Sequence, residues 1–346
     1  MRALAILVLV PALLTGCTSD PDPTTFDFET MGTVARCELQ LPDGLAPAEA
    51  QTLVTTVYDS VATVFSTWDP DTELSSLNRA PADSAVTLSS WLFECLDEAE
   101  RMRVLSEGAF DPTAGPLMHL WGFHRREGRL PAQAEIDSAR ALMGGWAFTG
   151  ESEVTKWTAE TRFDLGGIAK GFAVDRAADR LRKAGVTDGL VDLGGNLFCL
   201  GGAPEREDWR VGIRDPLDRN TWFASVNVTG RAVATSGSYE RFVTIDGTRY
   251  GHIMNPRTGR PAEGVLGVTV FAETAVLADA LSTALFVQGP GWGRIFLKTL
   301  PDEVDVLMVV PGPEGGKARV LVTSGLFDRV TLLEGYGETY ELVEWE

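Results

Sequence analysis

The sequence predicts an α+β fold, in which helices and strands occupy separate stretches of the chain. Helical spacing of apolar residues dominates the first half, whereas runs typical of strands cluster after residue 188. Hydrophobic residues make up 44% of the 346 residues and charged residues 23%, so the chain can fill a large core and is not intrinsically disordered. The length fits one large domain or two subdomains, with a candidate boundary near residue 150.

Apolar residues that recur every three or four positions predict five helices in the body of the chain. We expect them at 50–66, at 91–106, after Pro131 and before Gly144, from about 167 to 184, and at 275–287. Gly108, Gly185 and the pair Gly289-Pro290 are stop signals. Strands are expected at 189–200, 209–214, 222–228, 241–245, 265–272, 306–310 and 319–322.

The charge balance excludes one class of partner. Acidic residues outnumber basic ones by 49 to 30, which gives a formal net charge of −19. A nucleic-acid-binding protein usually carries a basic surface, so we expect no nucleic acid as a partner. An anionic small molecule can still bind where backbone amides, a few Lys or Arg side chains, or a metal ion neutralise it locally.

The first sixteen residues are typical of a secretory signal peptide: Arg2, an apolar run over 3–14, and then small residues. The run is shorter than the ~20 residues that a membrane-spanning helix needs. The sequence Leu14-Thr15-Gly16-Cys17 resembles a bacterial lipobox. We therefore expect cleavage before Cys17 and lipidation of that cysteine. A secreted protein with an unmodified Cys17 is the alternative.

Residues 17–25 are rich in Pro, Asp, Ser and Thr and read as a flexible tether, so the body would cover residues 26–346. A lipid anchor would place the body in the bacterial cell envelope, facing the periplasm or the exterior. Cys37, Cys95 and Cys199 remain in the body. Their spacing matches no zinc site, and we expect all three to be small buried apolar residues.

Three segments rich in Gly and small polar residues could hold a ligand through their backbone. Residues 108–116 form a turn dense in Gly and Pro, followed by aromatic residues. In 164–171, the pair Gly166-Gly167 opens a helix, so free N–H groups and Lys170 would favour an anion there. Residues 233–239 carry small hydroxyl side chains at the end of a strand. For each segment an ordinary turn is the alternative.

A fourth segment, 251–261, begins with His252 and continues into a turn rich in Pro and Gly. An imidazole with a reference pKa of ~6.5 is suited to taking a proton from a hydroxyl near neutral pH. The other histidines, His119 and His124, lie near the first segment. A purely structural role is the alternative for His252.

The fifth segment, 278–284, places Asp279, Ser282 and Thr283 on one face of a predicted helix, because they are separated by three and four positions. One carboxylate and two hydroxyls are the oxygen donors that a hard cation such as Mg²⁺ prefers. The alternative is that Asp279 simply faces solvent, but its apolar neighbours argue against it. Together the five segments indicate a site for an anionic, phosphorylated ligand with a divalent metal and one base.

The order of these segments resembles the ApbE-type flavin transferases, the FAD:protein FMN transferases. The match runs from Met31 to about Pro290 and includes Met31-Gly32-Thr33, Phe65-Ser66-Thr67-Trp68 and Ser75-Ser76-Leu77-Asn78. The resemblance implies mixed sheets with packed helices and an active site in a cleft between two subdomains. It also implies transfer of FMN from FAD to a Thr or Ser hydroxyl of a partner protein, with release of AMP. The acceptor motif of the family is of the Ser/Thr-Gly-Ala-Thr type.

The resemblance also implies roles for individual residues. His252 would be the general base. Mg²⁺ would lie between the carbonyl of Gly167 and the side chains of Asp279, Ser282 and Thr283. The residues expected to hold FAD are Met31, Trp68, Ala109, Phe110, Asp111, Asp164, Lys170 and Met254.

The sequence departs from the family at three positions. Trp68 stands where a Tyr is common, which still allows stacking on a flavin or adenine ring. Ser282 stands where other members can have an Asp, and a neutral hydroxyl would bind a cation more weakly than that carboxylate. Gly166 replaces a Ser, which we interpret as a packing variation.

Two other functions would use the same residues. A Mg²⁺-dependent FAD pyrophosphatase would release FMN and AMP, with water in place of the protein hydroxyl. A flavin-binding lipoprotein would hold FAD without chemistry, but pure binding needs neither His252 nor the oxygen face at 279–283. An FMN acceptor is not expected, because the sequence contains no Ser/Thr-Gly-Ala-Thr run.

Overall fold

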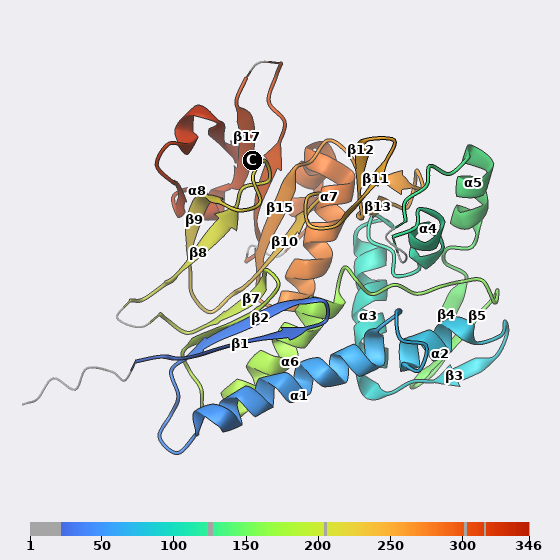
Figure 1. The fold of residues 1–346 in the computed structure, drawn as a ribbon, viewed down its shortest axis with the longest axis horizontal. Helices are drawn as coiled ribbons and strands as arrows, with labels where there is room; N and C mark the ends of the chain where they lie inside the picture. The colour runs from blue at the N-terminus through green and yellow to red at the C-terminus, as the bar shows by residue number, and fades with distance from the viewer. Residues whose placement is uncertain (1–21, 124–126, 204–205, 301–302, 315, 346) are drawn as a thin grey trace, which may run out of the picture.

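A nine-stranded sheet runs through the middle of the fold (Figure 1). The computed structural model describes residues 22–123, 127–203, 206–300, 303–314 and 316–345. The strands of the sheet lie in the order β1 (Thr24–Thr30), β2 (Thr33–Leu39), β6 (Gly189–Leu193), β7 (Asn196–Leu200), β10 (Ala232–Gly237), β15 (Gly267–Ala272), β16 (Asp305–Val310), β17 (Ala318–Thr323) and β19 (Tyr340–Trp345). Neighbours are antiparallel except β17 and β19, which are parallel.

Four long helices, several short ones and four small sheets complete the described chain. The long helices are α1 (Pro47–Phe65), α3 (Ser90–Leu105), α6 (Ala169–Lys183) and α7 (Ala275–Leu297). The short ones are α2 (Glu73–Arg79), α4 (Gly115–Leu120), α5 (Gln133–Ala141), α8 (Ser324–Phe327) and the 3-10 turn Tyr336–Glu338. Small sheets are formed by β3 (Ala85–Thr87), β5 (Glu153–Lys156) and β4 (Trp146–Gly150); by β18 (Val330–Leu332), β9 (Trp222–Val228) and β8 (Trp209–Arg214); by β11 (Phe242–Ile245) with β12 (Thr248–Gly251); and by β13 (Met254–Asn255) with β14 (Arg260–Pro261).

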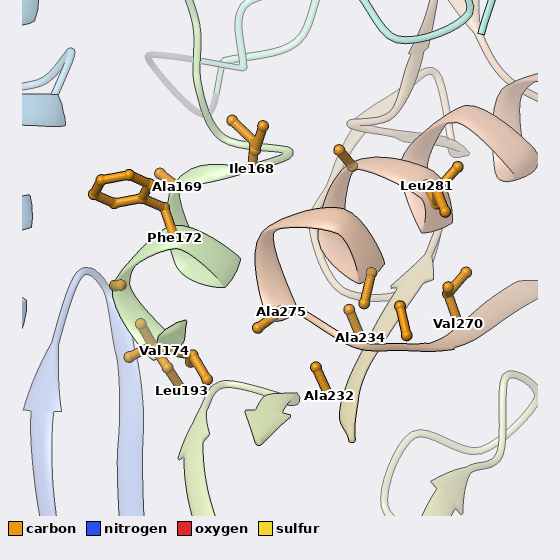
Figure 2. Close-up of a cluster of buried hydrophobic side chains, with 14 of the residues drawn as sticks. Ile168, Ala169, Phe172, Val174, Leu193, Ala232, Ala234, Val270, Ala275 and Leu281 are labelled. Atoms are coloured by element: carbon orange, nitrogen blue, oxygen red, sulfur yellow. The ribbon is translucent and has the colours of Figure 1, made fainter. Parts of the chain in front are cut away.

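The middle strands of the main sheet, such as β7, β15 and β16, are buried on both faces. Along β15, Val268, Val270 and Ala272 join a core that also contains residues of the long helices, whereas Phe271 points to a second core shared with β8 and β9. This follows from the alternation of side chains along a strand. Figure 2 shows part of the first core, where Phe172 comes from α6, Leu281 from α7, and Ala234 and Val270 from the sheet, while Ile168 directly precedes α6.

The first turn of α6 packs directly against the start of α7. A Cβ built on Gly171 would lie 2.2 Å from the carbonyl oxygen of Ala275, so only glycine allows this close approach. The carboxylate of Asp175 accepts hydrogen bonds from the backbone N–H groups of Ala275 and Val276, at 2.7 and 2.8 Å. Asp175 thus satisfies two N–H groups that the start of α7 would otherwise leave without a partner.

The predicted α+β class is confirmed, and all five predicted helices are present, each starting within three residues of its expected first residue. The predicted strand 189–200 was wrong as a single run. It is a hairpin of β6 and β7, because Gly194 and Gly195 both adopt positive φ and turn the chain back. The predicted stop at Gly289 is a kink with φ 73°, after which the helix continues to Leu297.

The body of the chain begins slightly earlier than predicted. β1 begins at Thr24, two residues before the expected start of the body at Phe26. β2 pairs with β6, so the main sheet draws on both sides of residue 150, and the two-subdomain division stays a prediction. The predicted signal peptide and Cys17 lie outside the described residues. Within those residues, no helix is long and apolar enough to cross a membrane. Cys37, Cys95 and Cys199 are free and buried, as predicted.

Candidate active site

The helix α7 presents the predicted oxygen donors toward the sheet. Asp279 is 3% exposed and Ser282 is fully buried, so the expectation that Asp279 does not face solvent is confirmed. The hydroxyl of Ser236, near the end of β10, lies 2.9 Å from the Ser282 hydroxyl and 3.4 Å from the Thr283 hydroxyl. Ser282 also donates to the carbonyl oxygen of Asp279 at 2.8 Å. The sheet and the helix therefore share one buried cluster of oxygen atoms.

The start of α6 closes this cluster from the other side. The backbone N–H of Gly171 donates to Oδ2 of Asp279 at 3.0 Å, and Nζ of Lys170 lies 3.7 Å from Oδ1. The anion that the helix N-terminus favours is, in this structure, the Asp279 carboxylate. A Cβ built on Gly167 would lie 3.1 Å from the Thr283 hydroxyl, so the Gly167 peptide adjoins the same donors.

The segment 108–116 meets the site at Phe110. A Cβ on Gly167 would lie 3.2 Å from a ring carbon of Phe110, which is buried together with Ala109. Asp111 accepts hydrogen bonds from the N–H and hydroxyl of Thr113, and burial raises the pKa of its carboxyl despite them. The backbone N–H of Asp164 donates to the carbonyl of Pro112 at 2.8 Å, which joins the first two segments.

His252 follows the hairpin of β11 and β12, and its ring is oriented by Arg241. Its Nδ1 lies 3.1 Å from the carbonyl oxygen of Arg241, and its backbone N–H donates to the same oxygen. Burial lowers the pKa of His252 to about 4, and the positive charges of Arg241 and Lys170 act in the same direction. His252 is therefore a neutral imidazole near pH 7.

Met31 lies in the tight turn between β1 and β2. Met31 and Gly32 both have positive φ, at 49° and 72°, which is the geometry of a two-residue hairpin turn. A Cβ on Gly32 would lie 4.0 Å from Nη2 of Arg241. The turn thus lies beside the residue that orients His252.

Two further predicted FAD contacts, Trp68 and Met254, differ in exposure. Trp68 follows α1 and is 61% exposed, which leaves it accessible for stacking. Met254 is 6% exposed and packs with Leu117, Trp121 and Ile136 in a third, separate core. The side chain of Met254 therefore serves packing here.

The donors at 279–283 suit a hard cation. They are one carboxylate, hydroxyls and a peptide carbonyl, which are oxygen ligands of the kind that Mg²⁺ takes while it retains water. Ser282 is the weakest of the set, because its hydroxyl already donates within the helix. In the part of the chain that the structure describes, no three His, Cys, Asp or Glu side chains gather as a metal site.

Sequence reasoning missed the residues that support the site. The carboxamide of Asn78 donates to the carbonyl of Phe163 and accepts from its N–H, at 2.9 and 2.7 Å. The buried ammonium of Lys156 donates to the carbonyls of Asn78, Ala159 and Thr161. These contacts fix the chain just before Asp164. Only the tertiary fold reveals them, because Asn78 and Phe163 are 85 positions apart.

The fold and the site together define an α+β protein in which a buried carboxylate, two hydroxyls and a lysine lie together, with a neutral histidine as a further candidate group. The ApbE family model matches residues 31–308. An FAD:protein FMN transferase of Vibrio cholerae is 32% identical over 323 residues, which cover 92% of this chain and 96% of the relative. One of Treponema pallidum is 35% identical over 282 residues and covers 76% of each chain.

Solved structures of the same family share the fold. The flavin transferase ApbE of Vibrio cholerae has a TM-score of 0.76 at 32% identity, covering 86% of this chain and 97% of its own. The ApbE protein of Thermotoga maritima has a TM-score of 0.78 at 31% identity, covering 86% and 96%. This chain belongs to the ApbE family. The family resemblance and the fold drawn from the sequence are thus confirmed, while the cleft between subdomains stays a prediction.

Proposed function

We propose that this chain is a divalent-cation-dependent FAD:protein FMN transferase, which moves FMN from FAD to a Thr or Ser hydroxyl of a partner protein. The observation that carries the proposal is the cluster of Asp279, Ser282 and Thr283 against Gly167 and Lys170. Relatives at about one-third identity over most of their length are named for this activity. In an acidic chain, such a cluster is where a diphosphate can be neutralised.

The transfer requires one base and one leaving group. The acceptor hydroxyl forms a bond to the phosphorus of the FMN phosphate, the bond from that phosphorus to the bridging oxygen breaks, and AMP leaves with the electron pair. The hydroxyl proton passes to His252, whose Nε2 is the accepting nitrogen because Nδ1 faces the carbonyl of Arg241. A neutral imidazole is ready for this task at pH 7.

Lys170 and the Asp279 group would hold the reacting diphosphate in place. Mg²⁺, when bound by Asp279, Thr283, Ser282 and the Gly167 carbonyl, supplies positive charge that stabilises the leaving phosphate. Lys170 lies within 3.7 Å of Asp279 and adds a second cation beside the same group. Trp68 offers an exposed ring for stacking, and the turn at Met31 and the segment 109–111 would enclose the rest of FAD.

The function is tested by incubating the purified full chain with FAD, Mg²⁺ and an acceptor domain that carries a Ser/Thr-Gly-Ala-Thr motif. The acceptor is then weighed by mass spectrometry. We expect a gain of one FMN phosphoryl unit, which EDTA prevents. An unmodified acceptor with AMP and free FMN in solution would instead identify a pyrophosphatase. Intact FAD that is bound but not consumed would identify a flavin carrier.

We also propose that Cys17 carries a lipid which anchors the protein in the bacterial cell envelope. The proposal rests on the apolar run over 3–14 and the lipobox-like residues before Cys17. Labelling growing cells with a fatty-acid analogue should mark the wild-type protein and leave Cys17→Ala unlabelled. Equal labelling of the two would remove Cys17 as the anchor.

A further inference from the structure

The side chain of Asn196 is fully buried, yet neither of its polar atoms has a partner. Its exposure is 0%, and both Oδ1 and Nδ2 lack a hydrogen bond. Elsewhere in the described part of the chain, only the hydroxyl of Tyr58 and Nε2 of Gln288 share this condition, each as a single atom. A buried amide without partners costs stability, so native proteins retain one mainly where it serves a purpose.

Asn196 faces the side of the sheet that α6 and α7 cover. It opens β7, directly after the turn at Gly194-Gly195. Along β7, Phe198 and Leu200 belong to the core beneath these helices, whereas Leu197 and Cys199 belong to the second core. Alternation along the strand therefore directs Asn196 toward the helices.

The register of the sheet places Asn196 beside the oxygen cluster. Leu197 pairs with Val233 of β10, so the next position brings Asn196 opposite Ala234, with Ser236 one diagonal step further on the same face. Diagonal neighbours on one face lie ~7–8 Å apart, within reach of long side chains and of a ligand between them. Ser236 is the residue whose hydroxyl contacts Ser282 and Thr283.

The other neighbour of Asn196 is the turn that carries Met31. The N–H of Gly194 donates to the carbonyl of Val34 at 3.0 Å, and a Cβ on Gly194 would lie 2.4 Å from the Thr33 hydroxyl. The turn before Asn196 thus packs against the start of β2, directly after the turn at Met31 and Gly32. Asn196 is set between two parts of the site, although it comes from neither.

We propose that Asn196 binds the hydrated cation and the FAD diphosphate together, an inference that rests on the proposed function. Oδ1 accepts a hydrogen bond from a water on the cation, and Nδ2 donates to a phosphate oxygen. A carboxamide is suited to this position because it offers an acceptor and a donor without adding charge. A carboxylate there would repel the phosphate, and an apolar side chain would offer neither bond.

The experiment compares Asn196→Leu with the wild type in two measurements, without any acceptor protein. The first is the urea midpoint of the ligand-free chain. Because leucine replaces polar atoms that have no partner, we expect a midpoint no lower than that of the wild type. The second is FAD binding by quenching of flavin fluorescence. With Mg²⁺ present, we expect an FAD dissociation constant raised ~10-fold or more, since hydrogen bonds to charged groups are lost.

Two further variants keep the test decisive. Asn78→Leu is the contrast, because its amide has two partners, and its midpoint should fall. Asn196→Asp preserves the shape, so it reports on binding even if Asn196→Leu folds poorly. It should weaken FAD binding further by charge repulsion. Wild-type FAD affinity in the Asn196 variants would overturn this inference and leave the proposed function intact. A wild-type chain that binds no FAD would overturn both.

Discussion

The imidazole Nδ1 of His252 lies 3.1 Å from the backbone carbonyl oxygen of Arg241. A carbonyl can only accept a hydrogen bond, so this contact assigns the proton of the neutral ring to Nδ1 and leaves Nε2 as the accepting nitrogen. The tautomer is thus set by the main chain of a residue whose side chain also keeps the ring neutral by its charge. Arg241 thus orients the ring of His252, while burial, with the charges of Arg241 and Lys170, keeps it neutral.

Removal of this base is the first prediction. We expect His252→Ala to lower the rate of FMN transfer by at least ~10²-fold, because the acceptor hydroxyl then loses its proton acceptor. FAD binding should persist. The exposed His119 of α4 provides the control, since His119→Ala should transfer FMN at the wild-type rate. A near wild-type rate for His252→Ala would withdraw the base assignment.

The second prediction concerns pH. With the pKa of His252 lowered to about 4, the transfer rate should stay flat from about pH 5 to 8 and fall only below that range. The free energy of unfolding should also depend on the protonation of His252. The unfolded chain binds a proton at ~6.5, so the contribution of His252 is present above pH 6.5 and is lost as the pH falls toward 4. Between pH 6.5 and 4, the free energy of unfolding of His252→Gln should fall less than that of the wild type. An equal fall in both would show that other groups cause it.

The third prediction concerns the carboxylate of Asp279. Asp279→Ala should abolish both the transfer and its response to Mg²⁺, because the cluster loses its one charged oxygen donor. Titration of Mg²⁺ against FMN transfer measures this. Glu273→Ala, an exposed acidic change just before α7, is the matched control. An unchanged cation response in Asp279→Ala would remove Asp279 from the metal site.

The fourth prediction concerns Ser282, which stands at a position where the family can have an Asp. Ser282→Asp would place a second carboxylate in a fully buried position beside Asp279. Without a divalent cation, we expect a lower melting temperature than in the wild type, because like charges repel in a buried site. Added Mg²⁺ should recover most of the loss. In Ser282→Ala, any fall in melting temperature should be the same with and without Mg²⁺. If Mg²⁺ also fails to raise the melting temperature of Ser282→Asp, Ser282 is not next to the cation.

The fifth prediction concerns the start of α7. Asp175→Ala removes the acceptor of two backbone N–H groups and should destabilise the chain by about 1–2 kcal/mol, the usual cost of losing such a cap. Urea unfolding measures it. Asp179 lies one turn further along α6 in an exposed ion pair, so Asp179→Ala should stay within ~0.5 kcal/mol of the wild type. Equal effects would show that Asp175 acts only as a surface charge.

Local patterns predicted the helices and the oxygen face of α7 because both depend on residues a few positions apart. The spacing of Asp279, Ser282 and Thr283 already places them on one side of a helix. The hairpin at Gly194-Gly195 was missed because an apolar run on either side masks two short strands. A paired glycine within such a run is the signal that could have revealed it.

Long-range contacts could not be predicted in this way. Nothing near Asp279 in the sequence indicates that the N–H of Gly171 would be its partner, since 108 positions separate them. The same holds for Asn78 with Phe163, and for the pairing of β2 with β6. The family resemblance supplied the set of site residues, but it did not assign roles to Arg241, Asn78 or Asn196.

The direction of β1 has a consequence for how the protein meets its acceptor. The strand runs from Thr24 to the turn at Met31, so the chain enters the body at one end of the strand and reaches the site at the other. Seven residues of strand span ~23 Å. The tether proposed to carry the lipid would join the body at the Thr24 end, away from the Met31 turn. An acceptor domain could then reach that turn without passing the lipid-bearing end of the strand.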